Sequence, residues 1–266
     1  MENLTTSRVA DSEHDLADAK VATLSPGRVM SDHTVRAFDA DLNDLIRMLS
    51  EMGGLAEKAV AQAIAALSGR NVGLAKKVVE LDDTIDALQR EIENKAIATV
   101  ALRQPVAVDL RSIIATLRAA SDLERIGDLA KNIAKRVIAL NGNYPTPKTV
   151  HGLRNMADLA LWQLHEVLES LALRDDAKAM SVWQGDQEID AIYTSLFREV
   201  LTYVMEDPGT VAFSIHLLFC AKNVERIGDH VTNIAEAVHY MIEGHPFENE
   251  RPKSDTTSSM HVPSFR

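Results

Sequence analysis

The pentapeptide ERIGD occurs twice in this chain, at residues 124–128 and again at residues 225–229. Both copies lie within stretches whose apolar residues recur at the three- and four-residue spacing of a helix. A shift of 101 positions extends the match, because eight of the twelve residues from Leu123 to Ala134 are identical to those from Val224 to Ala235. The pentapeptide therefore belongs to a duplicated helix.

The duplication reaches back over earlier helical segments. With a shift of 104 positions, nine residues between Leu55 and Asp86 recur at the matching positions of residues 159–190. The three-residue difference between the two shifts falls between Asp86 and Glu124, where a proline-containing turn can absorb it. We therefore predict an all-α fold made of two tandem, pseudo-symmetric three-helix bundles.

Turn residues set the expected boundaries of these units. Ser31 or Asp32 is expected to cap the first helix, and NGNYPTPK at 141–148 is the clearest linker, with two prolines and an Asn-Gly turn. In chain order we expect a flexible N-terminal arm (1–31), a first bundle (32–140), a linker (141–149), a second bundle (150–245) and a disordered tail (246–266).

Composition narrows the class of protein. The chain has 266 residues, 46% of them hydrophobic, with only 12 Gly and 8 Pro, which favours helices.

Its net charge of −11 argues against nucleic acid as a partner, since phosphate binding needs a basic surface. Cys220 is the single cysteine, and the first residues lack the pattern of a secretory signal, so we expect a cytoplasmic protein. No phosphate-binding glycine loop is present, and no organic cofactor is expected.

Each ERIGD copy places two carboxylates four residues apart. At about 100° per residue, Glu124 and Asp128 lie within about 40° of each other, while Ile126 faces the opposite, core side. The preceding helix carries a second pair at the same spacing in each half. The candidate metal ligands are therefore Asp82, Asp86, Glu124 and Asp128 in the first half, and Asp186, Asp190, Glu225 and Asp229 in the second. We expect them on the outer rim of each bundle, away from the core.

One such pair could be an ordinary solvated face, since like charges at this spacing cost a helix only a few tenths of a kcal/mol. Four pairs retained at matching positions, while neighbours such as Lys131 and Thr232 have diverged, favour a functional role. Carboxylates without His or Cys select Mg, Mn, Ca or Fe. A metal-dependent carboxylate enzyme, a metal-storage protein and a metal-free scaffold remain alternatives. A di-iron bundle needs two Glu-x-x-His motifs, and the duplicated helix offers only Glu236 with His239.

Other conspicuous residues have structural interpretations. Gly127 and Gly228 are unfavourable in a helix by about 1 kcal/mol each, which predicts a close neighbouring helix at both. Trp162 and Trp183 lie near apolar stripes and are expected in the core, and His216 is expected at a core or interface position.

Several segments resemble the PhoU family. Residues 104–136 and 216–241 are similar to its two signatures, residues 33–53 to its usual opening, and ELDDTID at 80–86 to its first acidic motif. The likeness covers about residues 33–244. It implies a pair of three-helix bundles with cations (Mg, Mn, Fe or Zn) bound by repeated E/D-x-x-x-D motifs, which fall on the eight carboxylates named above.

The resemblance also implies a function. PhoU-like proteins are negative regulators of phosphate uptake and of the phosphate-starvation response, without catalysis of their own. They act as adaptors between the ATPase subunit of the phosphate transporter and the phosphate-sensing histidine kinase. A homodimer, peripheral to these membrane complexes, is expected. The halves differ where the first has Asp109-Leu110-Arg111 and the second has TVAFSI, so no role of Asp109 or Arg111 is transferred to the second half.

Overall fold

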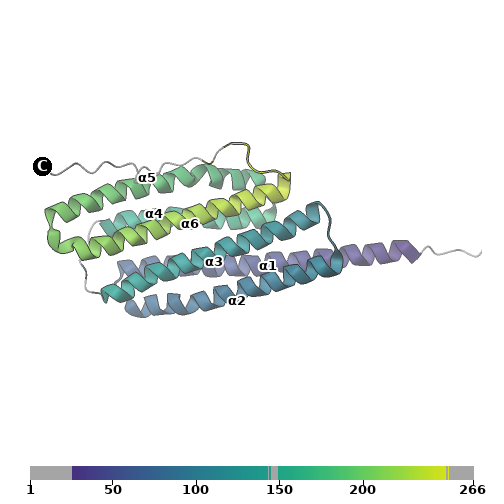
Figure 1. The fold of residues 1–266 in the computed structure, drawn as a ribbon, viewed down its shortest axis with the longest axis horizontal. Coiled ribbons are helices and arrows are strands. Elements are labelled where there is room, and N and C mark those ends of the chain that lie inside the picture. The colour runs from purple at the N-terminus through teal and green to yellow at the C-terminus, as the bar shows by residue number, and fades with distance from the viewer. Residues whose placement is uncertain (1–25, 143, 145–148, 250, 252–266) are drawn as a thin grey trace, which may run out of the picture.

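The computed structural model describes residues 26–142, 144, 149–249 and 251, with side chains from residue 37 onward except that of Thr149. Over these residues the fold is all-α, without a strand. Its elements are α1 (Pro26–Ser68), α2 (Val72–Arg103), α3 (Val108–Leu140), α4 (Thr149–Leu173), α5 (Asp176–Glu206), the 3₁₀ turn η1 (Pro208–Thr210) and α6 (Val211–Glu243). Helices α1–α3 pack into one bundle and α4–α6 into another (Figure 1), which confirms the predicted fold class.

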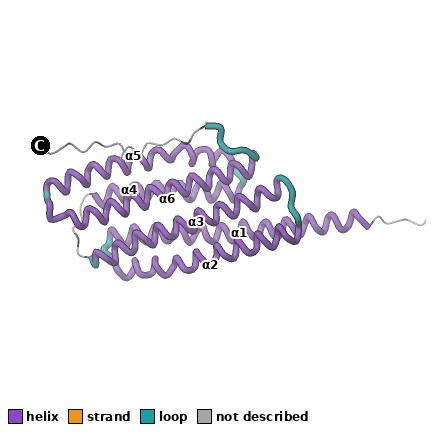
Figure 2. The backbone as a smooth tube through the Cα atoms, in the orientation of Figure 1, coloured by secondary structure: helices purple, strands orange, loops and turns teal. Residues whose placement is uncertain are grey.

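The two bundles lie side by side along their length. Helix α3 packs against α6 and α1 packs against α4, as Figures 1 and 2 show. Apolar side chains from both bundles form one continuous buried core. Between α3 and α6, Asp122 Oδ1 lies 2.8 Å from His230 Nδ1 and accepts a hydrogen bond from the Asn233 amide at 3.1 Å. The duplication has therefore produced one tightly packed molecule.

The turn between the first two helices of each bundle repeats in atomic detail. Arg70 and Arg174, which correspond under the 104-residue shift, both adopt left-handed backbone angles, with φ of 53° and 54°. In each copy the next amide donates to the carbonyl five residues earlier at 2.9 Å, the pattern of a Schellman cap. The side chains of Asn71 and Asp175 then cap the following helix. The duplication therefore includes the turn as well as the helices.

The repeated glycines of ERIGD make room for the helix alongside. A Cβ atom added at Gly127 would lie 3.0 Å from Ile85 Cδ1, and one added at Gly228 would lie 2.8 Å from Ile189 Cδ1. Both isoleucines are fully buried on the preceding helix of their bundle. The prediction of a close neighbouring helix at both glycines is confirmed.

The structure corrects both expected ends of the folded region. Helix α1 begins at Pro26 rather than at Ser31 or Asp32, because a proline suits the first helical position, where no amide hydrogen bond is lost. Residues 1–25 of the expected arm lie outside the described residues. At the other end, Phe247 and Arg251 pack onto the second bundle, although the sequence favoured a disordered tail from residue 246. Isolated residues of this kind leave no periodic pattern that a sequence reading can detect.

One of the two tryptophans is misplaced by the sequence reading. Trp183 is 5% exposed, as predicted, but Trp162 is 53% exposed. The core-facing positions of α4 include Met156, Ala160 and Leu164, and Trp162 falls about 200° from Ala160 around the helix. Cys220 is fully buried among apolar side chains, and this burial raises the pKa of its thiol to about 12. No helix among the described residues has both the length and the apolar composition needed to cross a membrane.

Candidate functional site

The four candidate carboxylates of the first half meet where α2 packs against α3. The Lys131 ammonium donates hydrogen bonds to Asp82 Oδ2 and, at 3.2 Å, to Asp128 Oδ1, so one cation joins the two helices. Glu124 is close enough to Asp86, Asp82 and Asp128 for their charges to raise its pKa. We call Asp82, Asp83, Asp86, Glu124 and Asp128 the first acidic site.

Asp83 belongs to this site although the sequence reading missed it. Carboxylate oxygens of Asp82, Asp83 and Asp86 lie within 4.8 Å of one another. Asp83 has no acidic counterpart in the second half, where Gln187 occupies the matching position, so the duplication argument could not select it. The run of acidic residues at 82–86 was the only signal that could have revealed it.

Half of the eight carboxylates are buried, which contradicts the expected outer rim. Asp82 is 1% exposed and Glu225 is 6% exposed, and Asp186 and Asp190 are also buried. Glu124, Asp128, Asp86 and Asp229 are partly exposed. Helical angles separate these residues from the apolar stripe of their own helix, but the neighbouring helix of the same bundle covers them: Asp82 lies beside Gly127 of α3, and Asp186 contacts Thr232 of α6.

Burial leaves some carboxylate oxygens without a protein partner. Among the described residues, no hydrogen-bond donor reaches Asp82 Oδ1, Asp86 Oδ1 or Glu225 Oε2. Asp82 Oδ1 lies beside Gly127 of α3, 3.5 Å from where a Cβ atom would stand, which is an ordinary van der Waals distance. Burial is the main cause that raises the pKa values of Asp82, Glu124 and Glu225. A buried oxygen without a partner is unfavourable, and either a proton or a cation would satisfy it.

The second half forms a matching arrangement between α5 and α6. We call Asp186, Asp190, Glu225 and Asp229 the second acidic site. Asp190 and Asp229 are close enough to Glu225 for their charges to raise its pKa further.

The cations of the second site differ from those of the first. The Lys222 ammonium lies 2.7 Å from Glu225 Oε1. Arg251, from the segment after α6, donates to both oxygens of Asp186 at 2.9 Å and to Asp229 Oδ1 at 2.7 Å. The four predicted carboxylates of each half are thus brought together, and each cluster holds more carboxylates than cations.

The chemistry of these sites suits hard cations. Every candidate ligand is a carboxylate oxygen, which Mg, Mn, Ca and Fe prefer and which soft thiophilic metals do not. The orphaned, buried oxygens of Asp82 and Glu225 fit that interpretation. The possible di-iron motif does not, because Glu236 is exposed and accepts a hydrogen bond from the Trp183 indole, while His239 Nδ1 lies 2.7 Å from Asp176.

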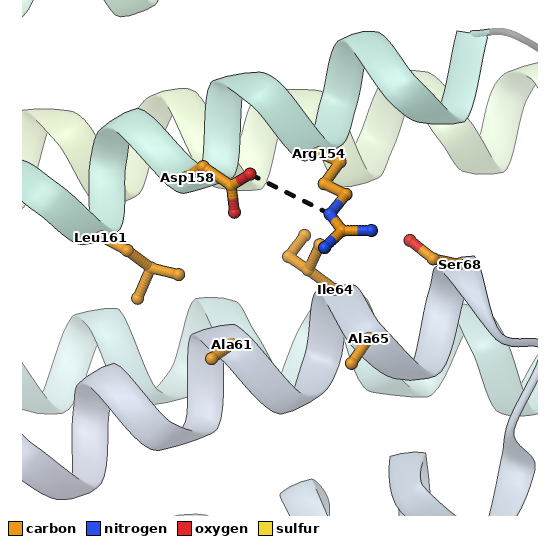
Figure 3. Close-up of a pocket in the computed structure, with 7 residues that line it drawn as sticks. All are labelled: Ala61, Ile64, Ala65, Ser68, Arg154, Asp158 and Leu161. Atoms are coloured by element: carbon orange, nitrogen blue, oxygen red, sulfur yellow. Dashed lines mark ion pairs between the residues drawn. The ribbon is translucent and has the colours of Figure 1, made fainter.

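A surface groove at the junction of the two bundles lies apart from the acidic sites. Figure 3 shows it between α1 and α4, where Ala61, Ile64 and Leu161 contribute apolar surface. Its charged residues are Arg154 and Asp158, which form an ion pair at 4.0 Å and are both mostly exposed. A groove of this composition offers no set of convergent catalytic groups.

The fold and the two acidic sites define a class of protein: a duplicated six-helix molecule with one carboxylate cluster per repeat. The chain belongs to the PhoU domain family, whose model matches residues 49–137 and 153–238. The likeness inferred from the two signature segments is therefore confirmed.

Individual relatives agree with this assignment. The chain is 54% identical over 228 residues to a protein of Rhizobium meliloti (strain 1021) named phosphate-specific transport system accessory protein PhoU homolog, covering 86% of this chain and 96% of the relative. A protein of the same name from Caulobacter vibrioides is 45% identical, covering 86% of this chain and all of the relative.

Solved structures show the same fold. The crystal structure of PhoU from Pseudomonas aeruginosa superposes with a TM-score of 0.76 at 39% identity, covering 78% of this chain and all of the other. That of the phosphate transport system regulatory protein PhoU from Streptococcus pneumoniae gives a TM-score of 0.74 at 30% identity, covering 80% of this chain and all of the other.

Proposed function

We propose that this protein is an accessory regulator of a phosphate-specific transport system. It restrains phosphate uptake and the phosphate-starvation response by acting as an adaptor between the transporter ATPase subunit and a sensor histidine kinase. Family membership across both repeats carries the proposal, together with relatives that are named as accessory proteins of that transport system. The absence of catalysis, a homodimeric state and a cytoplasmic location are parts of the same proposal.

The duplicated architecture supports an adaptor role. Each half presents an acidic site of its own, and the two halves share one core, so two partners could be held in a fixed relative orientation. The halves are similar but not identical, since Lys131 and Arg125 supply the cations in the first site and Lys222 and Arg251 supply them in the second. The first and second acidic sites can therefore bind different partners.

Divalent or ferric cations are proposed as ligands of both acidic sites. Asp82, Asp86, Glu124 and Asp128 would hold a cation in the first half, and Asp186, Asp190, Glu225 and Asp229 in the second. A bound cation would supply positive charge that offsets the mutual repulsion of the carboxylates and changes the charge of the contact face. The chain's own residues supply the framework: α2 with α3, and α5 with α6, hold the carboxylates in place.

Genetic deletion tests the regulatory proposal. Removing the protein is expected to make phosphate-uptake genes constitutive in phosphate-rich medium, and supplying the wild-type chain is expected to restore repression. Repression that persists after deletion would overturn the proposal. Transcript levels of the uptake genes provide the measurement.

Partner capture tests the adaptor step. Charge reversal of Glu124 and Asp128, or of Glu225 and Asp229, is expected to weaken binding to one partner each in a pull-down with the purified ATPase subunit and kinase. Lysine substitutions at Glu199 and Glu206, two exposed residues near the far end of α5, provide a charge-matched control that should bind normally. Normal binding of both partners by both site variants would contradict the adaptor proposal.

A further inference from the structure

The segment after α6 turns back over the second bundle. Helix α6 ends at Glu243 and is capped by Gly244, whose φ of +83° is left-handed, and a loop then carries the chain over the α5 side of the second bundle (Figure 2). Phe247 stacks on the Trp183 ring with centroids 4.7 Å apart and on the His239 ring with centroids 3.9 Å apart. We call residues 244–249 with Arg251 the C-terminal segment.

Arg251 inserts its guanidinium into the second acidic site. Its side chain is only 16% exposed. It forms a two-bond fork with the Asp186 carboxylate and a third hydrogen bond with Asp229, which are two of the four candidate cation ligands. Burial opposes the charge of Arg251, but the hydrogen bonds and charge of Asp186, with Asp229 nearby, outweigh it and raise the pKa of Arg251. Planar, bidentate pairing of this kind is among the strongest that a carboxylate makes with a side chain.

The first acidic site lacks an equivalent of this arrangement. Its cations are Lys131 and Arg125, which both stand on α3 within one turn of Asp128. The position matching Lys131 in the second half is Thr232, whose hydroxyl lies 3.1 Å from Asp186 Oδ1 and carries no charge. The first site therefore takes its cations from a core helix only, whereas the second combines Lys222 of α6 with Arg251 from a terminal segment.

We infer that the C-terminal segment is a built-in competitor that must leave the second acidic site before a divalent cation or a basic group of a partner can enter it. The guanidinium and an incoming cation need the same oxygens of Asp186 and Asp229. Occupation by one therefore excludes the other. The apparent affinity of the second site for a cation equals its intrinsic affinity multiplied by the fraction of molecules in which the segment has left the site. The inference rests on the proposed binding of cations.

The residues of the C-terminal segment are different from the buried residues that form the core of the second bundle. The segment contacts the second bundle through Arg251 and through Phe247, which is only partly buried against the core, and its Gly244 lies beside Arg111 of α3. The buried apolar residues of the second bundle's core lie on helices α4–α6. Release of the segment is thus compatible with a folded second bundle. Entry of a cation or of a partner's basic group into the second acidic site then depends on whether another molecule binds the C-terminal segment and holds it away.

Manganese binding measured on the second site alone tests the inference. The first site is disabled by Asp82→Asn with Glu124→Gln, which remove one buried and one partly exposed carboxylate whose pKa values burial already raises. Equilibrium dialysis with elemental analysis then compares Arg251 with Arg251→Ala, which is expected to bind Mn²⁺ at least about tenfold more tightly. Arg251→Lys should fall between them, because an ammonium keeps the charge but loses the fork. Arg198→Ala, at an exposed position on α5, removes the same charge and should leave the affinity unchanged.

A second readout follows the segment itself. In a Trp162→Phe background, Trp183 is the only tryptophan, and Phe247 stacks on it. Titration with Mn²⁺ should shift the emission maximum of Trp183 toward that of a Phe247→Ala variant, because the segment leaves as the ion enters.

The possible failures can be told apart. Equal Mn²⁺ affinity with and without Arg251, or an emission maximum that stays constant while the ion binds, overturns the inference. Binding confined to an intact first site, with none at the second in any Arg251 variant, overturns it while leaving cation binding by the first site in place. A protein that binds no Mn²⁺ at either site removes the proposed cation function and the inference together.

Discussion

Replacement of Glu225 by glutamine is expected to stabilise the cation-free protein. The glutamate is 6% exposed, and its Oε2 atom has no hydrogen-bond donor among the described residues. A buried acceptor left unsatisfied costs about 1–3 kcal/mol. The change weakens the pair with Lys222, whose side chain is 42% exposed and whose contribution is therefore about 0–1 kcal/mol. The free energy of unfolding at pH 7 should rise by about 1 kcal/mol.

The pH dependence has a definite sign. Because burial raises the pKa of Glu225, the folded protein holds that proton more tightly than the unfolded chain does. The resulting stability is fully present below the ordinary pKa of a glutamate and is lost as pH rises through the raised value. The difference between wild type and Glu225→Gln should therefore be largest at pH 7 and should shrink as the pH falls and Glu225 becomes protonated.

Cations should reverse the order of stability. In excess, a cation that binds only the folded state stabilises by about 2.7 kcal/mol at a hundred times its dissociation constant. The wild type should gain this stabilisation at its second site, and Glu225→Gln should gain much less. Urea unfolding followed by circular dichroism, with EDTA or with Mn²⁺, measures both quantities. Glu199→Gln, at an exposed position on α5, is the matched control and should change stability by less than about 0.5 kcal/mol. A Glu225→Gln variant that is less stable than wild type in EDTA, or that responds equally to Mn²⁺, would refute the reasoning.

Two further predictions concern the first acidic site and the glycine contacts. Lys131→Ala should lower the free energy of unfolding by about 2–3 kcal/mol in EDTA, somewhat below the cost of breaking a fully buried pair because the lysine is 23% exposed. Mn²⁺ should restore the loss by replacing the missing charge, and a loss that Mn²⁺ leaves unchanged would argue against a cation site there. Gly54→Ala in the middle of α1 should stabilise by about 1 kcal/mol, since no described atom lies within 4 Å of the new Cβ. Gly228→Ala should not be stabilising, because its new Cβ would lie only 2.8 Å from Ile189 Cδ1. Equal thermal stability of the Gly54→Ala and Gly228→Ala variants would count against this close contact.

The sequence by itself determined the helices, the duplication and the choice of carboxylates. Hydrophobic periodicity and a repeat spacing of 101–104 residues are local properties of the chain, and they predict two three-helix bundles without knowledge of any contact. The glycines of ERIGD indicated a close helix for the same reason, since a costly residue in a helix interior needs a packing explanation. The eight acidic positions followed from comparison of the two halves.

Only the tertiary structure decided how those carboxylates are surrounded. A single helix has a core side and an outer side, but whether a neighbouring helix covers the outer side depends on packing between segments distant in sequence. Asp82 and Glu225 were therefore expected in solvent and are buried. The cations are also non-local: Lys131 reaches Asp82 across 49 residues, and Arg251 reaches Asp186 across 65. No periodic pattern encodes a single arginine beyond the last helix, and so the difference between the two acidic sites emerges only when the chain is folded.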